Sequence, residues 1–310
     1  MMRIAIAGSG GLARIFAQCL DSVGTYTVII LSRRPQPALT ADGFQVIVVN
    51  YDDQTDLRYT LRGIDVVIST VSGSPQINLI DAAAHSGVSR FVPAEFEGPP
   101  GRRTTNDPLD RGKKATIARL KEWSHDSRHR MRFTIFSCGV FYQRFARGGL
   151  AAYNIGSGTG IQQEGDYLMN LGTSTAEIVE FNAAGQSLYV CLTSVYDLAK
   201  FVAAALELGP STWPAEFRLQ SDRRTVSEII QWGAVVKGQS DLDTIVHQAS
   251  ALPAHLEYHS FHRNWTQLAR FQELAATEQG RYNFSQPTLN QLVNVVPEPF
   301  WDWLYREWGS

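Results

Sequence analysis

The sequence predicts an α/β fold in which a doubly wound parallel sheet is followed by a smaller C-terminal α+β lobe. Three observations predict it. Apolar runs alternate with helical stretches through residues 3–141. The apolar runs end in polar or glycine-containing segments, and the alternation is lost in the second half of the chain. Such alternation is typical of right-handed βαβ units, whose helices cover both faces of a parallel sheet.

The elements of the first half are assigned from apolar runs for strands and from helical apolar periodicity for helices. The strands are expected at 3–7, 26–31, 44–49, 65–69, 89–93 and 131–137, and the helices at 12–20, 57–61, 75–85 and 108–125. Asn106 or Asp107 is the expected N-cap of the last of these helices, with Pro108 in its first turn.

The second half is expected to be less regular. Its predicted elements are a hairpin of 178–181 and 188–192, helices at 195–208 and 225–237, and closing segments at 287–293 and 300–308. A chain of 310 residues is at the upper limit for a single core. We therefore expect a first domain at residues 1–150 and a second lobe at residues 151–310.

A glycine turn follows the first strand directly and precedes the first helix: Gly8-Ser9-Gly10-Gly11-Leu12-Ala13. Its spacing fits G-x-G-x-x-A, in which glycine permits a tight turn and a close approach of the backbone to a pyrophosphate. The free N–H groups and the dipole of the helix N-terminus favour that anion. A position between a strand and a helix supports a dinucleotide site. The motif therefore predicts a Rossmann-type dinucleotide-binding domain.

Ligands of open parallel sheets bind beyond the carboxyl ends of the strands. The segments that follow the other expected strands should therefore meet the glycine turn at one rim of the sheet. Their candidate cofactor-binding residues are Ser32, Arg33, Arg34, Asp52, Thr70, Val71, Ser72, Gly139, Val140 and Phe141.

Two arginines stand where an NAD site would carry an acidic residue, about 20 residues after the glycine turn. No acidic residue lies between Asp21 and Asp42, whereas Arg33 and Arg34 follow the second strand. Guanidinium groups suit a ribose 2′-phosphate, because their planar fork binds two oxygens at once. The pair therefore predicts NADP(H) rather than NAD(H); the alternative is a solvated arginine pair ahead of Pro35.

The composition is that of an ordinary globular enzyme. A net charge of −2, with 44% hydrophobic and 19% charged residues, gives no reason to expect nucleic acid or an anionic membrane as a partner. The three cysteines are far apart and odd in number, so neither a disulfide framework nor a zinc ribbon is expected. The first strand begins at once, and no apolar run approaches the ~20 residues that span a bilayer. We expect a cytoplasmic monomer or homodimer that acts on a small molecule.

A stretch after the fourth expected strand carries a resemblance to a known family. Gln76–Ala84 reads QINLIDAAA, and Gly87–Phe96 reads GVSRFVPAEF. Together they resemble the isoflavone-reductase-like and NmrA-like branch of the atypical short-chain dehydrogenases. The chain departs from this pattern at Ala94, where serine is usual, and at Glu97, where glycine is usual. The resemblance covers most of residues 3–208.

The resemblance implies a Rossmann-type fold, bound NADP(H), and a role for Gln76, Ala94, Glu95 and Phe96 in holding the cofactor. The family includes reductases of plant and fungal aromatic metabolites. We therefore expect an NADPH-dependent reductase of a small aromatic or polycyclic metabolite, with residues 138–170 and 250–270 shaping its pocket. The alternatives are an isomerase or cyclase that uses NADP(H) without net redox change, and a non-catalytic NADP sensor.

The resemblance also implies a catalytic lysine on the helix after Pro93–Phe96, which contacts the nicotinamide ribose and relays a proton. Lys113 and Lys114 are the candidates. The family spacing places a β-branched residue three positions after the lysine, which selects Lys114 through Ile117. Helical geometry favours Lys113, which lies almost on the same face as Ile117 and Leu120. We expect Lys114 to act and keep Lys113 as the alternative.

Two further patterns are expected to be structural. Tyr196 and Lys200 match Y-x-x-x-K, but they lie beyond the sixth expected strand, where the resembling family has a structural helix start. His255, His259 and His262 could share a helix face, but a metal site would also need a suitably placed carboxylate or cysteine. We expect no metal there, and a surface or pocket-lining role instead.

Overall fold

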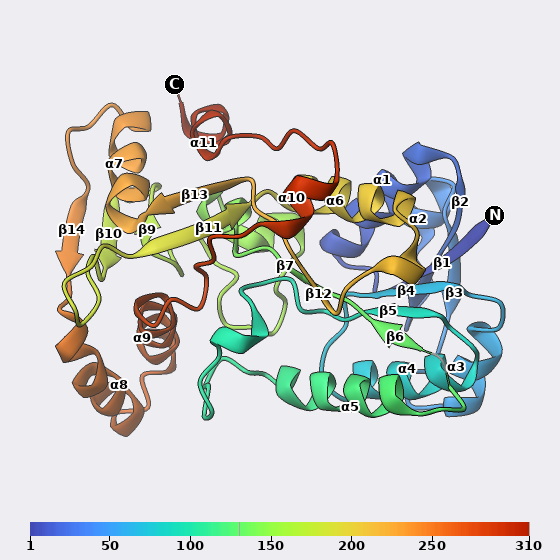
Figure 1. Ribbon diagram of the computed structural model, residues 1–310. Coiled ribbons are helices and arrows are strands. Elements are labelled where there is room, and N and C mark those ends of the chain that lie inside the picture. The colour runs from blue at the N-terminus through green and yellow to red at the C-terminus, as the bar shows by residue number, and fades with distance from the viewer. Residues whose placement is uncertain (130, 310) are drawn as a thin grey trace.

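The computed structural model of the chain describes residues 1–129 and 131–309 (Figure 1). Its main sheet has six parallel strands in the order β3-β2-β1-β4-β5-β6. These are β1 Met2–Ala7, β2 Tyr26–Ser32, β3 Gln45–Val48, β4 Val66–Ser69, β5 Arg90–Val92 and β6 Arg132–Phe133. The order, which reverses between β1 and β4, is that of a doubly wound Rossmann-type sheet. The predicted fold class is confirmed.

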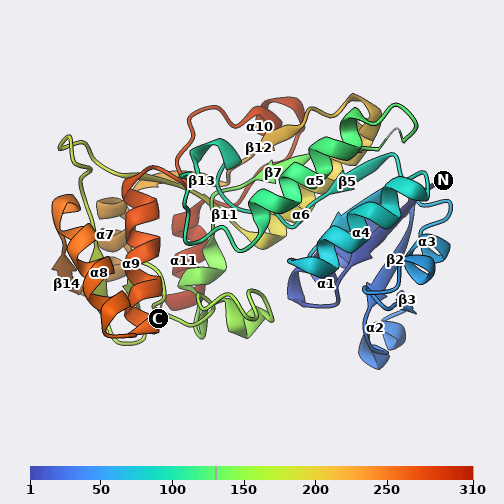
Figure 2. The ribbon, with the colours of Figure 1, turned by 90° about the horizontal axis from the view of Figure 1, so that it is seen from below.

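Helices cover both faces of this sheet. Along β1, Ile4 and Ile6 belong to one core and Ala5 and Ala7 to the other, as the alternation of a strand requires. Helices α1 and α6 pack on the Ile4 face, and α3, α4 and α5 pack on the opposite face, with α4 and α5 side by side in Figure 2. The helices are α1 Gly11–Val23, α2 Pro37–Ala41, α3 Gln54–Thr60, α4 Ser74–His85, α5 Lys113–His125 and α6 Val195–Glu207.

The strand predicted at 131–137 is in fact two strands. β6 stays in the main sheet, whereas β7, Ile135–Ser137, pairs in parallel with β12, Glu216–Arg218. Thr134 lies at the change of partner, where its hydroxyl donates to the carbonyl of Pro214 at 2.7 Å. The prediction of one continuous strand is wrong because an apolar run does not reveal which neighbour each of its residues will pair with.

The second half contains two small sheets, ordered β14-β10-β9 and β13-β11-β8. Their strands are β8 Val140–Phe141, β9 Met169–Asn170, β10 Thr175–Ile178, β11 Tyr189–Thr193, β13 Asp222–Thr225 and β14 Asp243–Val246. The helices beyond α6 are α7 Val226–Val236, α8 Leu252–Phe261, α9 Trp265–Glu278, α10 Thr288–Leu292 and α11 Phe300–Trp308. α7, α8 and α9 lie at the end of the molecule away from α3 (Figure 1).

The hairpin predicted from 178–181 and 188–192 is reduced to one antiparallel bridge, between Phe181 and Ser187. The strands beside it belong to different sheets. β10 pairs with β14 and β9, whereas β11 pairs with β13 and β8. The turn was predicted correctly, but the pairing of its flanking strands was wrong because these strands diverge beyond the bridge.

Helix α11 supplies an aromatic core to the second half. Phe300 and Trp303 are buried against Tyr142, with ring centroids 5.0 and 5.4 Å from it. The indole N–H of Trp308 donates to the carbonyl of Phe145 at 2.7 Å. These tilted rings pack as aromatic pairs prefer. Helix α6 lies after residue 150 in the chain but packs in the same core as α1. The domain boundary near residue 150 therefore stays a prediction.

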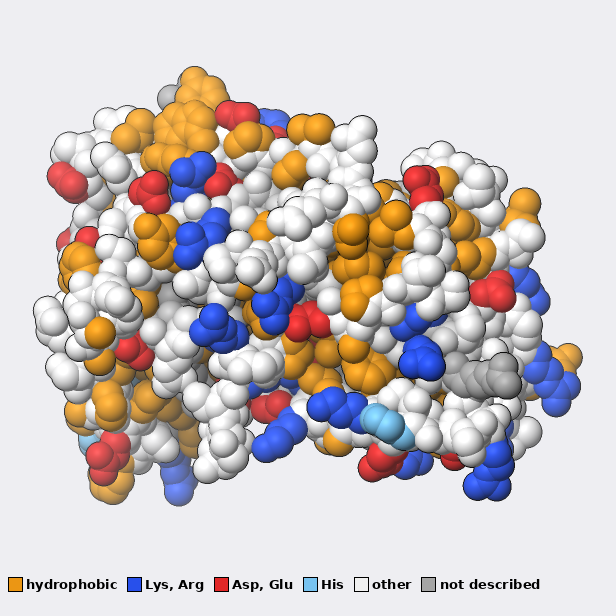
Figure 3. All heavy atoms as spheres, in the orientation of Figure 1, with side chains coloured by type: hydrophobic (Ala, Val, Ile, Leu, Met, Phe, Trp, Pro, Cys, Tyr) orange, Lys and Arg blue, Asp and Glu red, His pale blue; other side chains and the backbone are white. Residues whose placement is uncertain are grey.

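The surface mixes charges of both signs. On the face shown in Figure 3, Lys and Arg side chains are spread among acidic, neutral and apolar ones. Within residues 1–129 and 131–309, no helix combines the length and the apolarity needed to cross a membrane.

Candidate functional site

The glycine turn lies at the switch point of the sheet, between the carboxyl ends of β1 and β4. Gly8 has φ +111°, and a Cβ built on it would overlap the Oγ1 of Thr70. The same hydroxyl donates to the carbonyl of Ala7 at 2.8 Å, so the turn lies tightly against the end of β4. Helix α1 begins at Gly11, and helix geometry leaves the N–H groups of its first turn without intrahelical acceptors. These residues fit the predicted anion cradle.

The residues that follow β2 lie beside this turn. The hydroxyl of Ser32 donates to that of Ser9 at 3.2 Å. Arg33 and Arg34 come next, and both are exposed. Tyr51 is buried. Burial raises the pKa of its hydroxyl, and the positive charge of Arg33 acts in the opposite direction. Two exposed arginines therefore follow the residue that bonds to the turn.

The other predicted rim residues of the first strands also follow the carboxyl ends. Asp52 lies beyond β3, is exposed, and accepts a hydrogen bond from the side-chain amide of Asn78 at 3.4 Å. Val71 and Ser72 lie beyond β4, half-buried and exposed respectively. These three residues lie at the rim that the topology predicts, and their side chains are exposed or partly exposed.

Gln76 ties three elements together at this rim. It is buried at the start of α4, where its Oε1 accepts from the N–H of Ala94 at 2.8 Å. Its Nε2 donates to the hydroxyl of Thr116 on α5 at 3.3 Å. Phe96 packs on Phe16 of α1, with ring centroids 5.3 Å apart. The loop after β5 is therefore held between α1 and α5.

Residues 149–155, which belong to a range expected to shape the pocket, lie on the glycine turn instead. The N–H of Gly11 donates to the carbonyl of Asn154 at 3.0 Å, and a Cβ on Gly11 would overlap the carbonyl oxygen of Tyr153. Asn154 has φ +53°, a left-handed conformation that asparagine tolerates better than most residues. An asparagine ahead of a glycine-rich stretch was the only sequence signal. The following N–H groups of α1 remain as donors of the cradle.

We expect Gly11→Ala to destabilise the protein by about 1–3 kcal/mol, because the added methyl group overlaps the Tyr153 carbonyl and displaces residues 149–155. Urea unfolding would show a lower midpoint at an unchanged m value. Gly101→Ala is the control, since a Cβ there meets nothing within 4 Å, and it should change stability by less than about 0.5 kcal/mol. Equal midpoints for Gly11→Ala and the wild type would contradict this packing.

An ion cluster forms where the loop after β5 meets α5 and the second half of the chain. Oε2 of Glu97 lies 2.5 Å from Nζ of Lys113. Oε1 of Glu97 lies 2.7 Å from Nη2 of Arg103 and 2.8 Å from that of Arg281. The six members are Glu95, Glu97, Arg103, Asp107, Lys113 and Arg281. Their formal charges cancel, which limits the cost of burying them.

The two carboxyl groups of Glu95 and Glu97 have opposite pKa shifts. Burial by itself would raise the pKa of Glu97, but the cations around it, Lys113 foremost, hold that pKa well below its usual range. Burial dominates at Glu95 and raises its pKa against the cations Lys113 and Arg103. Glu97 is therefore ionised at neutral pH, with its charge directed at Lys113.

Helix α5 starts later than predicted, at Lys113 rather than near residue 108. Gly112 is the N-cap, and the carboxylate of Asp110, two residues before it, accepts from the N–H of Lys114 at 2.9 Å. The predicted caps, Asn106 and Asp107, are wrong. Asp107 instead pairs with Arg281 in the ion cluster. The segment that contains Asp107, before α5, is a loop.

The structure gives the two candidate lysines different surroundings. The side chain of Lys113 is only 15% exposed, in the ion cluster. Lys114 is exposed, and its Nζ lies 3.4 Å from the carbonyl of Thr105. The backbone carbonyl of Glu97 accepts from the N–H groups of Cys138 and Gly139 at 2.8 and 3.2 Å. Lys113 is thereby linked to the predicted Gly139–Phe141 segment, and Lys114 is not.

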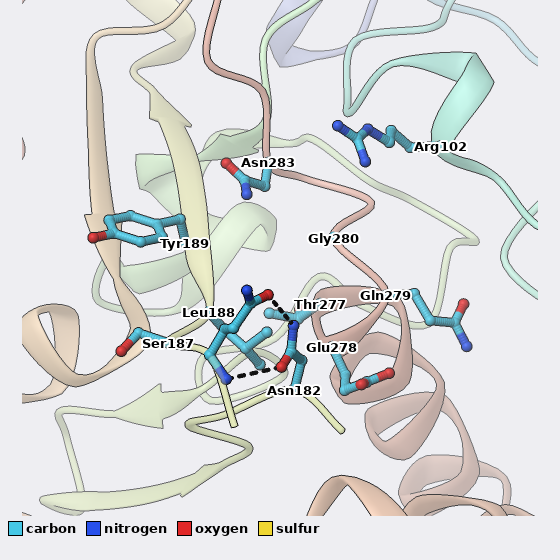
Figure 4. A pocket seen from close by; sticks show the side chains of 11 residues that line it. Arg102, Asn182, Ser187, Leu188, Tyr189, Thr277, Glu278, Gln279, Gly280 and Asn283 are labelled. Carbon is cyan, nitrogen blue, oxygen red and sulfur yellow. Dashed lines mark hydrogen bonds between the residues drawn. The ribbon is translucent and has the colours of Figure 1, made fainter. Parts of the chain in front are cut away.

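Two cavities open near the ion cluster. The larger has a volume of about 570 Å³, with Arg102 on one side, Tyr189 on the other, and Asn182 and Asn283 among its polar walls (Figure 4). The smaller, of about 160 Å³, is lined in part by Asp107 and Arg281. Of the predicted pocket-shaping ranges, 138–170 lines neither cavity and 250–270 contributes Leu256 to the smaller one.

The two patterns expected to be structural have structural surroundings. Tyr196 is exposed on α6, and Lys200 pairs with Asp197 of the same helix at 3.0 Å. His255 stacks on Phe271, with ring centroids 4.4 Å apart. In the described part of the chain, no group of three or more His, Cys, Asp or Glu side chains has an arrangement that could hold a metal ion.

Known proteins resemble part of this chain in sequence. Residues 7–133 match the family model of NAD(P)H-binding domains. Oxidoreductase aprR of Aspergillus flavus is 35% identical over 100 residues, which are 31% of this chain and 34% of that protein. A bifunctional pinoresinol-lariciresinol reductase of Linum usitatissimum is 27% identical over 128 residues, 36% of this chain and 40% of that protein. The chain thus covers 34% and 40% of the length of these two relatives.

The likeness in fold extends over nearly the whole chain. The binary complex of leucoanthocyanidin reductase with NADPH from Vitis vinifera superposes with a TM-score of 0.70, at 18% identity and over 98% of both chains. Isoflavone reductase superposes with a TM-score of 0.71, at 18% identity and over 98% of both chains.

The sheet order and the glycine cradle define a Rossmann-type α/β protein. Residues 7–133 are an NAD(P)H-binding domain. The dinucleotide predicted from the glycine turn is therefore confirmed. The fold expected from the resemblance to the isoflavone-reductase-like branch is likewise confirmed, because isoflavone reductase superposes over 98% of both chains.

Proposed function

We propose that the protein is an NADPH-dependent reductase of a small aromatic metabolite. The observation that carries the proposal is Lys113, a largely buried amine on α5. Through Glu97 it is linked to the same rim as the glycine cradle. A bound dihydronicotinamide supplies a hydride. The chain must then supply a proton to the reduced substrate, and Lys113 is the acid that we assign.

Arg33 and Arg34 are proposed to select NADPH over NADH. They follow β2 beside the cradle and are exposed, so both can reach a 2′-phosphate without losing an existing buried contact. In the described residues following β2 up to Ala41, no carboxylate stands ready to accept from a ribose 2′-hydroxyl. Ser32, whose hydroxyl already bonds that of Ser9, holds the start of this segment.

We assign the proton to Nζ of Lys113 in preference to Lys114. A proton donor acts on a bound substrate from a fixed position that is shielded from bulk water. Lys113 has such surroundings in the ion cluster, whereas Lys114 is solvated. The family spacing that selects Lys114 through Ile117 uses only positions along the chain. The burial of the side chain depends on the folded structure, and we therefore give it more weight.

The proposed substrate class rests on relatives that reduce aromatic molecules. Reductases of pinoresinol, isoflavone and leucoanthocyanidin are among the proteins of similar sequence or fold. Lys113 and the glycine turn line neither of the two cavities, so these relatives alone support the substrate class.

The decisive measurement is the stoichiometry of NADPH oxidation with pinoresinol, an isoflavone and a leucoanthocyanidin as probes. We expect at least one probe to be reduced by two electrons, detected by mass spectrometry as a gain of two hydrogens or as the replacement of a hydroxyl by hydrogen, with an equal amount of NADPH oxidised. Conversion with only catalytic amounts of cofactor would instead support the isomerase or cyclase. Tight NADPH binding without conversion of any probe would favour the sensor. Either result would overturn the reductase assignment.

A further inference from the structure

We propose that Glu97 is a positioning residue for Lys113. Its carboxylate pairs with Nζ of Lys113 and holds that amine in place at the rim. The inference rests on the proposed role of Lys113 in the reductase reaction. It goes beyond that role because the resembling family has glycine at this position, so the carboxylate is an addition of this chain.

The two oxygens of the Glu97 carboxylate have separate partners. Oε1 is held by both arginines of the cluster, at 2.7 Å by Arg103 and at 2.8 Å by Arg281. Oε2 lies 2.5 Å from Nζ of Lys113. Because the arginines cannot lose their protons, they fix the carboxylate and its charge. Lys113 is the third cation on this carboxylate.

The backbone of Glu97 is fixed as firmly as its side chain. Its carbonyl accepts from the N–H of Cys138 at 2.8 Å and from that of Gly139 at 3.2 Å. The carboxylate therefore has a fixed position between the loop after β5 and the segment after β7. That position determines where the amine of Lys113 lies. The side chains of Glu97 and Lys113 are 18% and 15% exposed, so their attraction is screened less than at the surface.

The proton balance of the step is simple. An Nζ–H bond of Lys113 breaks, a bond from that proton to the reduced substrate forms, and Lys113 is left as a neutral amine. A new proton from the solvent then binds Nζ after the product leaves, so one proton is consumed per turnover. Glu97 takes no proton at any stage, since the cations around it hold its pKa well below the usual range.

The test measures the amine directly and needs no substrate. Each protein, with NADPH bound, is treated with acetic anhydride at pH 8, and the acetylation rates of Lys113 and Lys114 are read by mass spectrometry. An ammonium group paired with a carboxylate does not react. In Glu97→Gln we expect Lys113 to react at least about tenfold faster, because the opposite charge next to it is gone. The rate of Lys114 serves as the internal reference and should not change.

Two variants separate charge from loosening of the cluster. Asp107→Asn breaks a different pair of the same cluster, that with Arg281, and should leave Lys113 slow. Glu97→Asp keeps the charge and should also leave it slow. A wild-type rate of Lys113 in Glu97→Gln would overturn the inference, as would a rise of equal size in Asp107→Asn. Neither result would bear on whether pinoresinol is reduced, so failure of this inference and failure of the proposed function are distinguishable.

Discussion

Lys113→Met is expected to lower kcat by about 10²–10⁴-fold, the range that a positioned general acid or base contributes. Methionine keeps the length of the side chain and removes the proton donor. The NADPH dissociation constant should change much less, because the glycine cradle and the arginine pair lie on other elements. Steady-state kinetics with a converted probe, and NADPH fluorescence titration of the same sample, measure the two quantities.

Lys114→Met is the informative partner, because the family spacing selects Lys114 and burial selects Lys113. We expect Lys114→Met to retain most of the wild-type kcat. Lys121→Met, an exposed lysine on the same helix, controls for the loss of one positive charge from α5. A large loss of kcat in Lys114→Met with near wild-type Lys113→Met would reverse the assignment and support the family spacing.

The fold of the first half was predictable because its determinants are local. Each strand of the main sheet is a short apolar run, and the glycine turn lies where a strand passes into a helix. The errors fall where tertiary partners decide. The apolar run 131–137 predicts one strand, but its second half pairs with β12 in another sheet. The sequence predicts Asp107 as a helix cap, but its carboxylate pairs with Arg281, which is far away along the chain.

The candidate site was predictable only in its first part for the same reason. Gly8–Ala13 and the arginine pair lie within one βαβ unit, so their spacing in the sequence fixes their arrangement. The contact of Asn154 with Gly11 joins residues with no such relation. The choice between Lys113 and Lys114 depends on Glu97, whose departure from the family pattern was visible in the sequence. Its partners were not, because they come from three separate segments.

Replacing both Arg33 and Arg34 by alanine should weaken NADPH binding by more than about tenfold and leave NADH binding nearly unchanged. A charge-assisted hydrogen bond contributes roughly 1.5–3 kcal/mol, and each 1.4 kcal/mol is about tenfold in affinity. Because both arginines are exposed, we take the lower end of that range. The two cofactors differ only in the 2′-phosphate, so their ratio isolates the contribution of the arginines. Fluorescence titration with each cofactor gives both dissociation constants.

The ratio also separates a specific contact from a general field. Arg58→Ala removes one positive charge from the last turn of α3, which is exposed and lies away from the rim, and it should leave both affinities unchanged. Arg33→Lys with Arg34→Lys keeps the charge but removes the planar fork, so it should restore only part of the NADPH affinity. If the alanine variant loses NADPH and NADH equally, the arginines support the fold of the rim rather than read the phosphate. If the lysine variant binds NADPH as the wild type does, charge alone selects the cofactor.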